Sequence, residues 1–304
     1  MLAPRKITDS FYQLATPFFP VYLSLGQDAM LIDAAIGGTF PLVQDQLREI
    51  GVNPASIKTV TLTHCHNDHI GLIPHLLKKW PHLKLQASAS AVETLAKEAV
   101  VKDFLAFDQQ VTAILQTKQV VAQVPEPFAD YRFHVDTVLE EGQVLELGNG
   151  IRWRVYATPG HSHCHISLLE EKEGTLVLGD TAGFYMPKLE AFWPNYFASL
   201  PKYCASLNRL RTLTATRLAL GHHGVLEGDG RAFLAKALEQ TREYHQEMLR
   251  RTDSGEDVGK LAAEKAKWVQ PNSEFMPHSL TEMCCQLLIK QSRKNADRTD
   301  LFPA

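Results

Sequence analysis

Short hydrophobic runs bounded by glycine, proline and asparagine predict β-strands in the first half of the chain, and runs with helical spacing predict helices between them. In one such run Leu42, Val43 and Leu47 recur at helical spacing, and Gly51 is a typical residue after a helix end. The predicted order is two strands within 18–33 joined by a tight turn at 26–28, a helix at 40–50, a strand at 58–63, a helix opening at 71–80, a strand at 83–87 and helices over 90–120.

The second half returns to strands. Ile151, Trp153 and Val155 alternate with arginines, which is the pattern of a strand with one buried face. Aromatic residues and two prolines crowd residues 183–197, which we interpret as a loop. The predicted elements are strands at 138–148, 151–158, 166–170, 175–179 and 216–220 and a helix at 198–212.

Beyond Gly230 the hydrophobic pattern is helical only, with charged faces and no strand signal. The predicted helices span 231–252, 255–268 and 279–293. The last of them carries Leu280, Met283, Leu287 and Leu288 at helical spacing, and we expect this apolar face to be buried. The chain therefore divides into two predicted parts, residues 1–229 with alternating strands and helices, and a helical extension at 230–304.

Composition narrows the class of protein. The chain has 304 residues, of which 45% are hydrophobic and 21% charged, as in globular enzymes. A net charge of −3 argues against a dedicated nucleic-acid surface. The sequence contains no run of 18 apolar residues, and its first residues lack the apolar core of a secretion signal. Five cysteines without framework spacing fit a reducing compartment, so we expect a cytoplasmic protein that binds neither membrane nor nucleic acid.

The strongest chemical signal lies between the predicted strand at 58–63 and the helix that follows it. Four potential metal ligands fall within six positions, namely His64, His66, Asp68 and His69. Histidines two apart on extended backbone can point to the same side, and a loop at a strand end can hold them in fixed geometry. Neutral imidazole and carboxylate suit zinc, iron and manganese alike. The sequence therefore predicts a metal site on this loop.

Three further motifs follow in order along the chain. They are Thr158-Pro159-Gly160-His161, Gly179-Asp180 and Gly221-His222, each at the end of a predicted strand. With the first loop, this set resembles the signature of the metallo-β-lactamase superfamily. The resemblance implies an α+β fold, a four-layer αββα sandwich. It implies that one metal ion binds His64, His66 and His161, that a second binds Asp68, His69 and His222, and that Asp180 bridges them.

The resemblance also implies an activity. Two divalent cations per chain, zinc in the first place with iron or manganese as alternatives, would share a bridging hydroxide that attacks an ester carbonyl. Asp68 and Asp180 are the predicted catalytic carboxylates. Within the superfamily the chain resembles thioesterases with a helical C-terminus that closes over the active site, and this resemblance implies an acyl-CoA-like thioester as the substrate. A lactonase, a hydroxyacylglutathione-type hydrolase and a partner-binding regulator that retains the metal site remain alternatives.

Several assignments stay open. His223 could replace His222 as the last ligand if the motif slips by one residue, although His222 fits the motif better. Cys65 and Cys164 flank predicted ligands, and we expect neither to bind metal. The predicted acyl pocket is formed by Phe184, Tyr185, Phe192, Trp193 and Met283, with core packing as the alternative role of the aromatic residues. The sequence is compatible with a homodimer.

Overall fold

The computed structural model describes residues 2–302, which form two compact units. The first, here called the sheet unit, comprises the residues up to 157 together with 164–179 and 217–227. The second, here called the helical unit, comprises 158–163, 180–216 and the residues from 228 onward. The chain thus crosses from one unit to the other several times, and each unit is described by itself.

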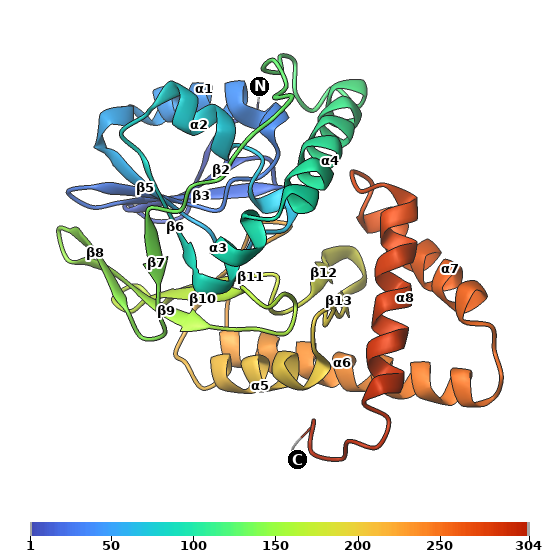
Figure 1. Cartoon of the computed structure of the whole chain (residues 1–304). Coiled ribbons are helices and arrows are strands. Elements are labelled where there is room, and N and C mark those ends of the chain that lie inside the picture. The colour runs from blue at the N-terminus through green and yellow to red at the C-terminus, as the bar shows by residue number, and fades with distance from the viewer. Residues whose placement is uncertain (1, 303–304) are drawn as a thin grey trace. The chain divides into compact units, whose positions relative to one another are not determined.

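The sheet unit contains two β-sheets, and the first has seven strands in sequence order (Figure 1). Its N-terminal strands pair antiparallel, and the pairings from β4 to β7 are parallel. The strands are β1 (Arg5–Lys6), β2 (Phe11–Ala15), β3 (Pro20–Leu25), β4 (Ala29–Ile32), β5 (Ile57–Thr61), β6 (Lys84–Ser88) and β7 (Thr137–Leu139).

The second sheet has six strands in the order β15-β14-β11-β10-β9-β8. All of its pairings are antiparallel except that of β11 with β14. The strands are β8 (Val144–Gly148), β9 (Ile151–Ala157), β10 (Ile166–Glu170), β11 (Thr175–Gly179), β14 (Arg217–Leu220) and β15 (Val225–Glu227). Every residue of β10 and β11 is buried, which explains their continuous hydrophobic runs.

The two sheets enclose a hydrophobic core. Trp153 of β9 is 1% exposed, and its ring centroid lies 5.4 Å from that of Phe11 in the other sheet. Its indole Nε1 donates a hydrogen bond of 2.9 Å to Ser24 Oγ, so the one polar atom of this ring is satisfied. Phe11, Tyr22, Met30 and Ile32 meet Leu145, Val155, Leu168 and Val177 around it.

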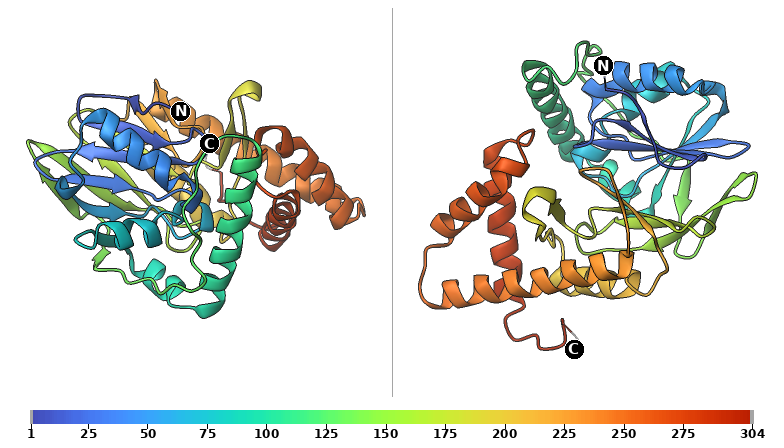
Figure 2. Two further views of the ribbon diagram at one scale, coloured as in Figure 1. Left: turned by 90° about the horizontal axis from the view of Figure 1, so that it is seen from above. Right: turned by 180° about the vertical axis from the view of Figure 1, so that it is seen from behind.

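Helices α1 (Phe40–Ile50) and α2 (Ile73–Lys79) lie over the outer face of the seven-stranded sheet (Figures 1 and 2), so the sheet unit has three layers, helices, sheet and sheet. Helix α3 (Ala89–Leu95) packs against β6 and β7, and α4 (Glu98–Thr117) packs against the turns at Gly37–Thr39 and Asn67–His69. Gln46 of α1 joins the first two layers, since its Oε1 accepts from Ala15 N at 2.7 Å and its Nε2 donates to Ala15 O at 3.1 Å.

The helical unit is built from four helices and a short hairpin. The elements are β12 (Phe184–Met186), β13 (Ala191–Trp193), α5 (Leu200–Leu210), α6 (Gly230–Asp253), α7 (Val258–Val269) and α8 (His278–Lys294). Short 3₁₀ turns complete the chain at Gly37–Thr39, Pro54–Ser56, Asn67–His69, Pro187–Leu189 and Gln270–Asn272. The side chain of Asp229 caps the N-terminus of α6, and that of Asp257 caps α7.

Three features of this unit differ from the prediction. Residues 183–197 are not an open loop, because β12 and β13 pair within them. The buried residues of α8 are Thr281, Cys285, Leu288, Ile289 and Ser292. Of the predicted apolar face, Leu288 is buried and Leu280 half-buried, and the prediction was wrong at Met283 and Leu287. Met283 is 49% exposed and Leu287 36% exposed. Finally, α6–α8 form a compact unit with 158–163 and 180–216 rather than one that begins at residue 230.

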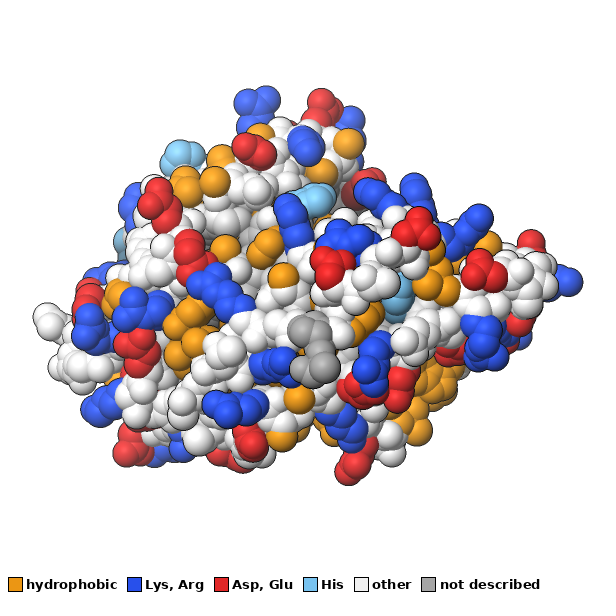
Figure 3. Space-filling view, turned by 90° about the horizontal axis from the view of Figure 1, so that it is seen from below, with side chains coloured by type: hydrophobic (Ala, Val, Ile, Leu, Met, Phe, Trp, Pro, Cys, Tyr) orange, Lys and Arg blue, Asp and Glu red, His pale blue; other side chains and the backbone are white. Residues whose placement is uncertain are grey.

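Among the described residues, no helix is long and apolar enough to cross a membrane. On the face drawn in Figure 3, acidic and basic side chains are interspersed, with hydrophobic side chains between them. This mixture agrees with the small net charge of −3.

We expect Trp153→Ala to lower the free energy of unfolding by about 3–5 kcal/mol, because it empties the space between the sheets and leaves Ser24 without its indole donor. The matched control is Trp268→Ala, since Trp268 is 37% exposed on α7. Denaturant midpoints followed by circular dichroism measure both. Equal losses in the two variants would contradict the role assigned to Trp153.

Candidate metal centre

The predicted ligand loop lies in the sheet unit, between the end of β5 and the start of α2. His64 is fully buried, His69 is 2% exposed and Asp68 is 8% exposed. His66 is half-buried. The ring centroids of His64 and His66 are 4.6 Å apart, and those of His64 and His69 are 4.1 Å apart. The structure therefore gathers the three imidazoles of this loop, as their spacing predicts.

A buried aspartate that the sequence analysis did not identify holds this loop in place. Asp33 follows β4, adopts a positive φ of 60° and is 2% exposed. Its Oδ1 accepts from Thr63 N at 2.7 Å, and its Oδ2 accepts from His69 Nδ1 at 3.0 Å. The Thr63 hydroxyl also donates to this carboxylate, at 2.8 Å to Oδ2. These charge-assisted hydrogen bonds fix both ends of the ligand loop to the parallel sheet.

The same contacts decide which ring nitrogen of each histidine faces the ligand cluster. A carboxylate and a carbonyl can only accept, so the proton lies on Nδ1 of His69 and on Nδ1 of His222, which donates to Phe18 O at 2.8 Å. The Thr63 hydroxyl donates to Asp33 and therefore accepts from His64 Nδ1, at 3.0 Å. Each neutral ring keeps its Nε2 lone pair for a metal ion, the arrangement common to metal-binding histidines.

Asp68, His69 and His222 form a cluster of donors within the sheet unit. Their ligand atoms all lie within 4.8 Å of one another, and His222 Nε2 is 3.4 Å from Asp68 Oδ2. Two imidazole nitrogens and one carboxylate suit a divalent transition metal. Both rings are oriented by hydrogen bonds from Nδ1, as such a site requires. The residues present therefore fit a metal ion.

His161 and Asp180 belong to the helical unit, where their side chains meet at 3.5 Å between Nε2 and Oδ2. His161 Nδ1 donates to Asn195 O at 3.0 Å, so this ring is oriented in the same way as His69 and His222. A Cβ on Gly160, at φ 137°, would come within 2.3 Å of the backbone of Tyr203. Only glycine allows this close approach to the first turn of α5.

Asp180 follows Gly179 directly in the sequence, and this glycine closes β11. A Cβ there would lie 2.6 Å from His165 Nε2 and 2.9 Å from Thr63 Oγ1. The ring of His165 stacks on that of His64, with centroids 4.9 Å apart. His165 therefore packs against the ring of His64, and only glycine fits at the end of β11 beside His165 and Thr63.

The adjacent residues His222 and His223 lie in different environments. His222 lies within the donor cluster, whereas His223 adopts a positive φ of 68° and packs edge-on against Phe18, at 5.4 Å between ring centroids. Burial lowers the pKa of His223 to about 4. The structure therefore places His222, and not His223, beside Asp68 and His69.

Helix α4 supplies a second support that the sequence analysis missed. Asp108 Oδ1 accepts from Gly37 N at 2.7 Å, and Thr112 Oγ1 accepts from Gly38 N at 3.1 Å. Burial raises the pKa of Asp108 to about 7, and the hydrogen bond from Gly37 opposes this shift. Both contacts tie the middle of α4 to the turn that follows Asp33.

The predicted acyl-pocket aromatics pack among themselves in the helical unit. Phe184, Phe192 and Trp193 are buried, and Tyr185 is half-buried. The ring of Phe192 lies 5.0 Å from that of Tyr185 and 4.8 Å from that of Phe233 on α6. Their core contacts account for their burial, and their contact with a substrate stays a prediction, as does that of Met283.

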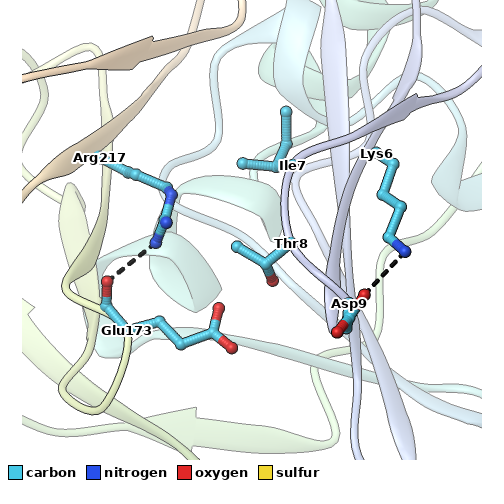
Figure 4. Close-up of a pocket in the computed structure, with 6 residues that line it drawn as sticks. All are labelled: Lys6, Ile7, Thr8, Asp9, Glu173 and Arg217. Carbon is cyan, nitrogen blue, oxygen red and sulfur yellow. Dashed lines mark hydrogen bonds and ion pairs between the residues drawn. The ribbon is translucent and has the colours of Figure 1, made fainter.

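A surface cavity of about 600 Å³ in the sheet unit lies elsewhere (Figure 4). Lys6 pairs with Asp9 at 2.7 Å, and Arg217 Nη1 donates to the backbone carbonyl of Glu173 at 2.9 Å. None of the predicted ligands lines it. The predicted ligands therefore lie apart from this cavity.

We expect Asp33→Asn to weaken metal binding by about 10–100-fold, because the amide loses the charge that orients His69 and Thr63. Competition with a chelator, read by elemental analysis, measures the affinity. Asp28→Asn is the matched control, since it makes the same change at an exposed position of the β3–β4 turn. Unchanged affinity in Asp33→Asn with intact circular dichroism would contradict the assignment.

The histidine doublet provides a second test. His222→Ala should lose at least half of the bound metal, because one of three donors in its cluster disappears, whereas His223→Ala should keep the wild-type content. Metal per chain after gel filtration measures both variants. The reverse result would move the ligand by one residue.

The chain is similar to several known proteins. The chain is 29% identical over 168 residues to a probable metallo-hydrolase, YflN, from Bacillus subtilis, covering 55% of this chain and 61% of that protein. It is 25% identical over 129 residues to a hydroxyacylglutathione hydrolase from Legionella pneumophila (42% and 35%). It is 26% identical over 157 residues to an atrochrysone carboxyl ACP thioesterase from Pseudocercospora fijiensis (51% and 34%). Each match spans less than two thirds of the relative's length.

Among solved structures, a metallo-beta-lactamase family protein from Thermus thermophilus has the same fold, with a TM-score of 0.64 and 21% identity over 96% of this chain and 95% of that one. This similarity confirms the α+β fold class. The sequence model of the metallo-beta-lactamase superfamily matches residues 21–222, which include all seven predicted ligands. Because this match covers well over half of its 304 residues, the chain belongs to the metallo-β-lactamase superfamily.

Proposed function

We propose that this protein is a dinuclear metal-dependent hydrolase that cleaves an acyl-CoA-like thioester. The observation that carries the metal-dependent part is the cluster of Asp68, His69 and His222, in which both rings present Nε2 because Nδ1 is held from behind. The chain belongs to a superfamily that includes metal-dependent hydrolases, and its own histidines and aspartates form groups that could hold a metal ion.

The proposed ligand set adds four further residues to this cluster. They are assigned by the order in which the superfamily motifs occur along the chain. One ion would take His64, His66 and His161, the other would take Asp68, His69 and His222, and Asp180 would serve both. The orientation of His64 by Thr63 and of His161 by Asn195 O supports this set within each unit. Zinc is the first choice for this nitrogen and oxygen donor set, and iron or manganese are the alternatives.

Bound divalent cations supply Lewis acidity for the attacking water and the thioester carbonyl. The residues of the chain orient the histidine rings and neutralise the charge of the cations. Asp68 carries one carboxylate oxygen for the metal and a second that can accept the proton released by water. Asp33 keeps His69 and Thr63 in register while this proton moves, and the carboxylates of Asp68 and Asp180 offset the cationic charge. The thiol leaving group has a pKa near 8.5, so it departs without a strong acid.

The thioester assignment rests on resemblance. The segment Thr63–Leu76, the motifs Gly160-His161-Ser162 and Gly179-Asp180, the run Gly221–Gly228 and the helical C-terminus resemble the quinolone-signal response protein, a 2-aminobenzoylacetyl-CoA thioesterase. That protein has an acidic pocket residue where Phe184 stands here, so we do not propose the same acyl group. The thioesterase and the hydroxyacylglutathione hydrolase among the relatives support thioester chemistry.

A helical cover is part of the proposal. The C-terminal helices would select the acyl group and exclude bulk water, and α8 keeps Met283 and Leu287 exposed, as a substrate-facing strip would be. The aromatic residues Phe184, Tyr185, Phe192 and Trp193 would form the other side of the acyl pocket. The proposal also includes a small-molecule substrate and a cytoplasmic location, and it is compatible with a homodimer.

The test is metal content combined with a substrate panel. We expect about two transition-metal ions per chain and turnover of acyl-CoA thioesters above that of acyl-homoserine lactones and S-lactoylglutathione. Asp68→Asn should lower kcat by about 10²–10⁴-fold, as expected for loss of a general base. Met283→Arg should change acyl-chain preference at unchanged metal content.

Three outcomes separate the alternatives. Preference for a lactone or for S-lactoylglutathione would replace thioesterase by the lactonase or hydroxyacylglutathione-type activity. Negligible turnover on the whole panel with full metal content would favour a partner-binding regulator. A chain that binds no metal at all would overturn the proposal.

A further inference from the structure

Two buried cysteines from distant parts of the sequence touch in the sheet unit. The sulfurs of Cys65 and Cys164 lie 3.1 Å apart, although 99 residues separate them in the chain. Each residue is 4% exposed. The structure has all the cysteines in reduced form. Neither thiol has a role in the proposed hydrolysis, because the histidines and aspartates already supply the donor set.

The pair is the last of three successive contacts between two segments. First, Ile166 N donates to Thr63 O at 2.8 Å. Next, the rings of His64 and His165 stack at 4.9 Å with an interplanar angle of 30°. Then come Cys65 and Cys164, so the residues meet one by one as in an antiparallel strand pair.

Each segment is also fixed independently of this pairing. Ser88 Oγ donates to Cys164 O at 2.7 Å, which anchors the backbone next to this thiol. Thr63 is bound to Asp33, two residues before Cys65. The two sulfurs are therefore held facing each other from both sides. A disulfide bond of about 2.05 Å requires them to approach by only about 1 Å.

We propose that Cys65 and Cys164 form a redox modification site, at which a peroxide oxidises the two thiols to an intramolecular disulfide. This disulfide would join the ligand loop covalently to the segment that leads into β10. The inference is independent of the substrate proposed above, because it concerns the thiols alone.

The reaction balances with hydrogen peroxide as the oxidant. One thiol loses its proton, and its sulfur attacks a peroxide oxygen; the O–O bond breaks, giving a sulfenic acid and one water. The second sulfur then attacks the sulfenic sulfur, the S–O bond breaks, and the hydroxyl leaves with the thiol proton as a second water. Two thiols lose two electrons in total, and peroxide is reduced to water.

A small oxidant can reach this pair. Residues next to both cysteines in the sequence contact solvent, since His66 is half-buried and His163 is exposed. Each cysteine itself retains 4% exposure, and hydrogen peroxide is little larger than water. Both cysteines are buried, so bulky alkylating agents should label them poorly in the native protein.

The experiment treats the purified full-length protein with graded hydrogen peroxide, blocks the remaining thiols with N-ethylmaleimide after denaturation, and maps the peptides by mass spectrometry. Before the maleimide step, we expect the intact mass of the oxidised protein to fall by about 2 Da. After digestion, we expect a cross-linked peptide pair that contains Cys65 and Cys164. Dithiothreitol should reverse both changes. The melting temperature of the oxidised protein should rise, since the cross-link closes a long loop.

Variants distinguish this site from the other cysteines. Cys65→Ser and Cys164→Ser should each abolish the cross-link and the rise in melting temperature. Cys204→Ser is the matched control, because Cys204 is equally buried in the helical unit, and it should keep both. If the serine variants fail to fold, the wild-type peptide map decides alone. Blocking of both Cys65 and Cys164 by maleimide after peroxide treatment, or a cross-link only between other cysteines, would overturn the proposal.

Discussion

The buried carboxylate of Asp33 is the contact on which the candidate site depends. It lies at the end of β4, where the parallel part of the first sheet begins, and takes hydrogen bonds from Thr63 and His69. A buried charge without partners would cost several kcal/mol, so the loop must keep these donors in place. The requirement acts in both directions. The loop satisfies Asp33, and Asp33 gives the loop its shape and His69 its tautomer.

The same principle recurs at each ordered histidine. His222 is held by the carbonyl of Phe18, and His161 by the carbonyl of Asn195. These partners come from the end of the β2–β3 turn and from the segment before α5, neither of which carries a predicted ligand. Each ring is thus oriented by backbone that is fixed for other reasons. A metal ion would meet rings that are already turned toward it, and the entropy of ordering them would have been lost on folding.

Glycine positions mark where segments must approach closely. Gly179 lies close against His165 and Thr63, and Gly160 lies close against the backbone of Tyr203, so neither position accepts a side chain. Both glycines immediately precede a predicted ligand. The Cys65–Cys164 pair lies on the same two segments of the sheet unit as the stacked rings of His64 and His165. The close packing that orients the ligands therefore also brings two thiols together.

Local sequence determined much of this protein. Residues 40–50 form a helix as predicted, because their apolar residues share one face and Gly51 ends it in a left-handed conformation. The strands at 151–157, 166–170 and 175–179 follow from alternation or from continuous apolar runs, and the ligand motifs follow from their spacing. Only the tertiary structure revealed Asp33, Asp108 and the cysteine contact, because each pairs residues far apart in the chain. Tertiary packing likewise decided which face of α8 is buried: neighbouring helices take Cys285 and Ile289 and leave Met283 in solvent, a choice that periodicity alone cannot make.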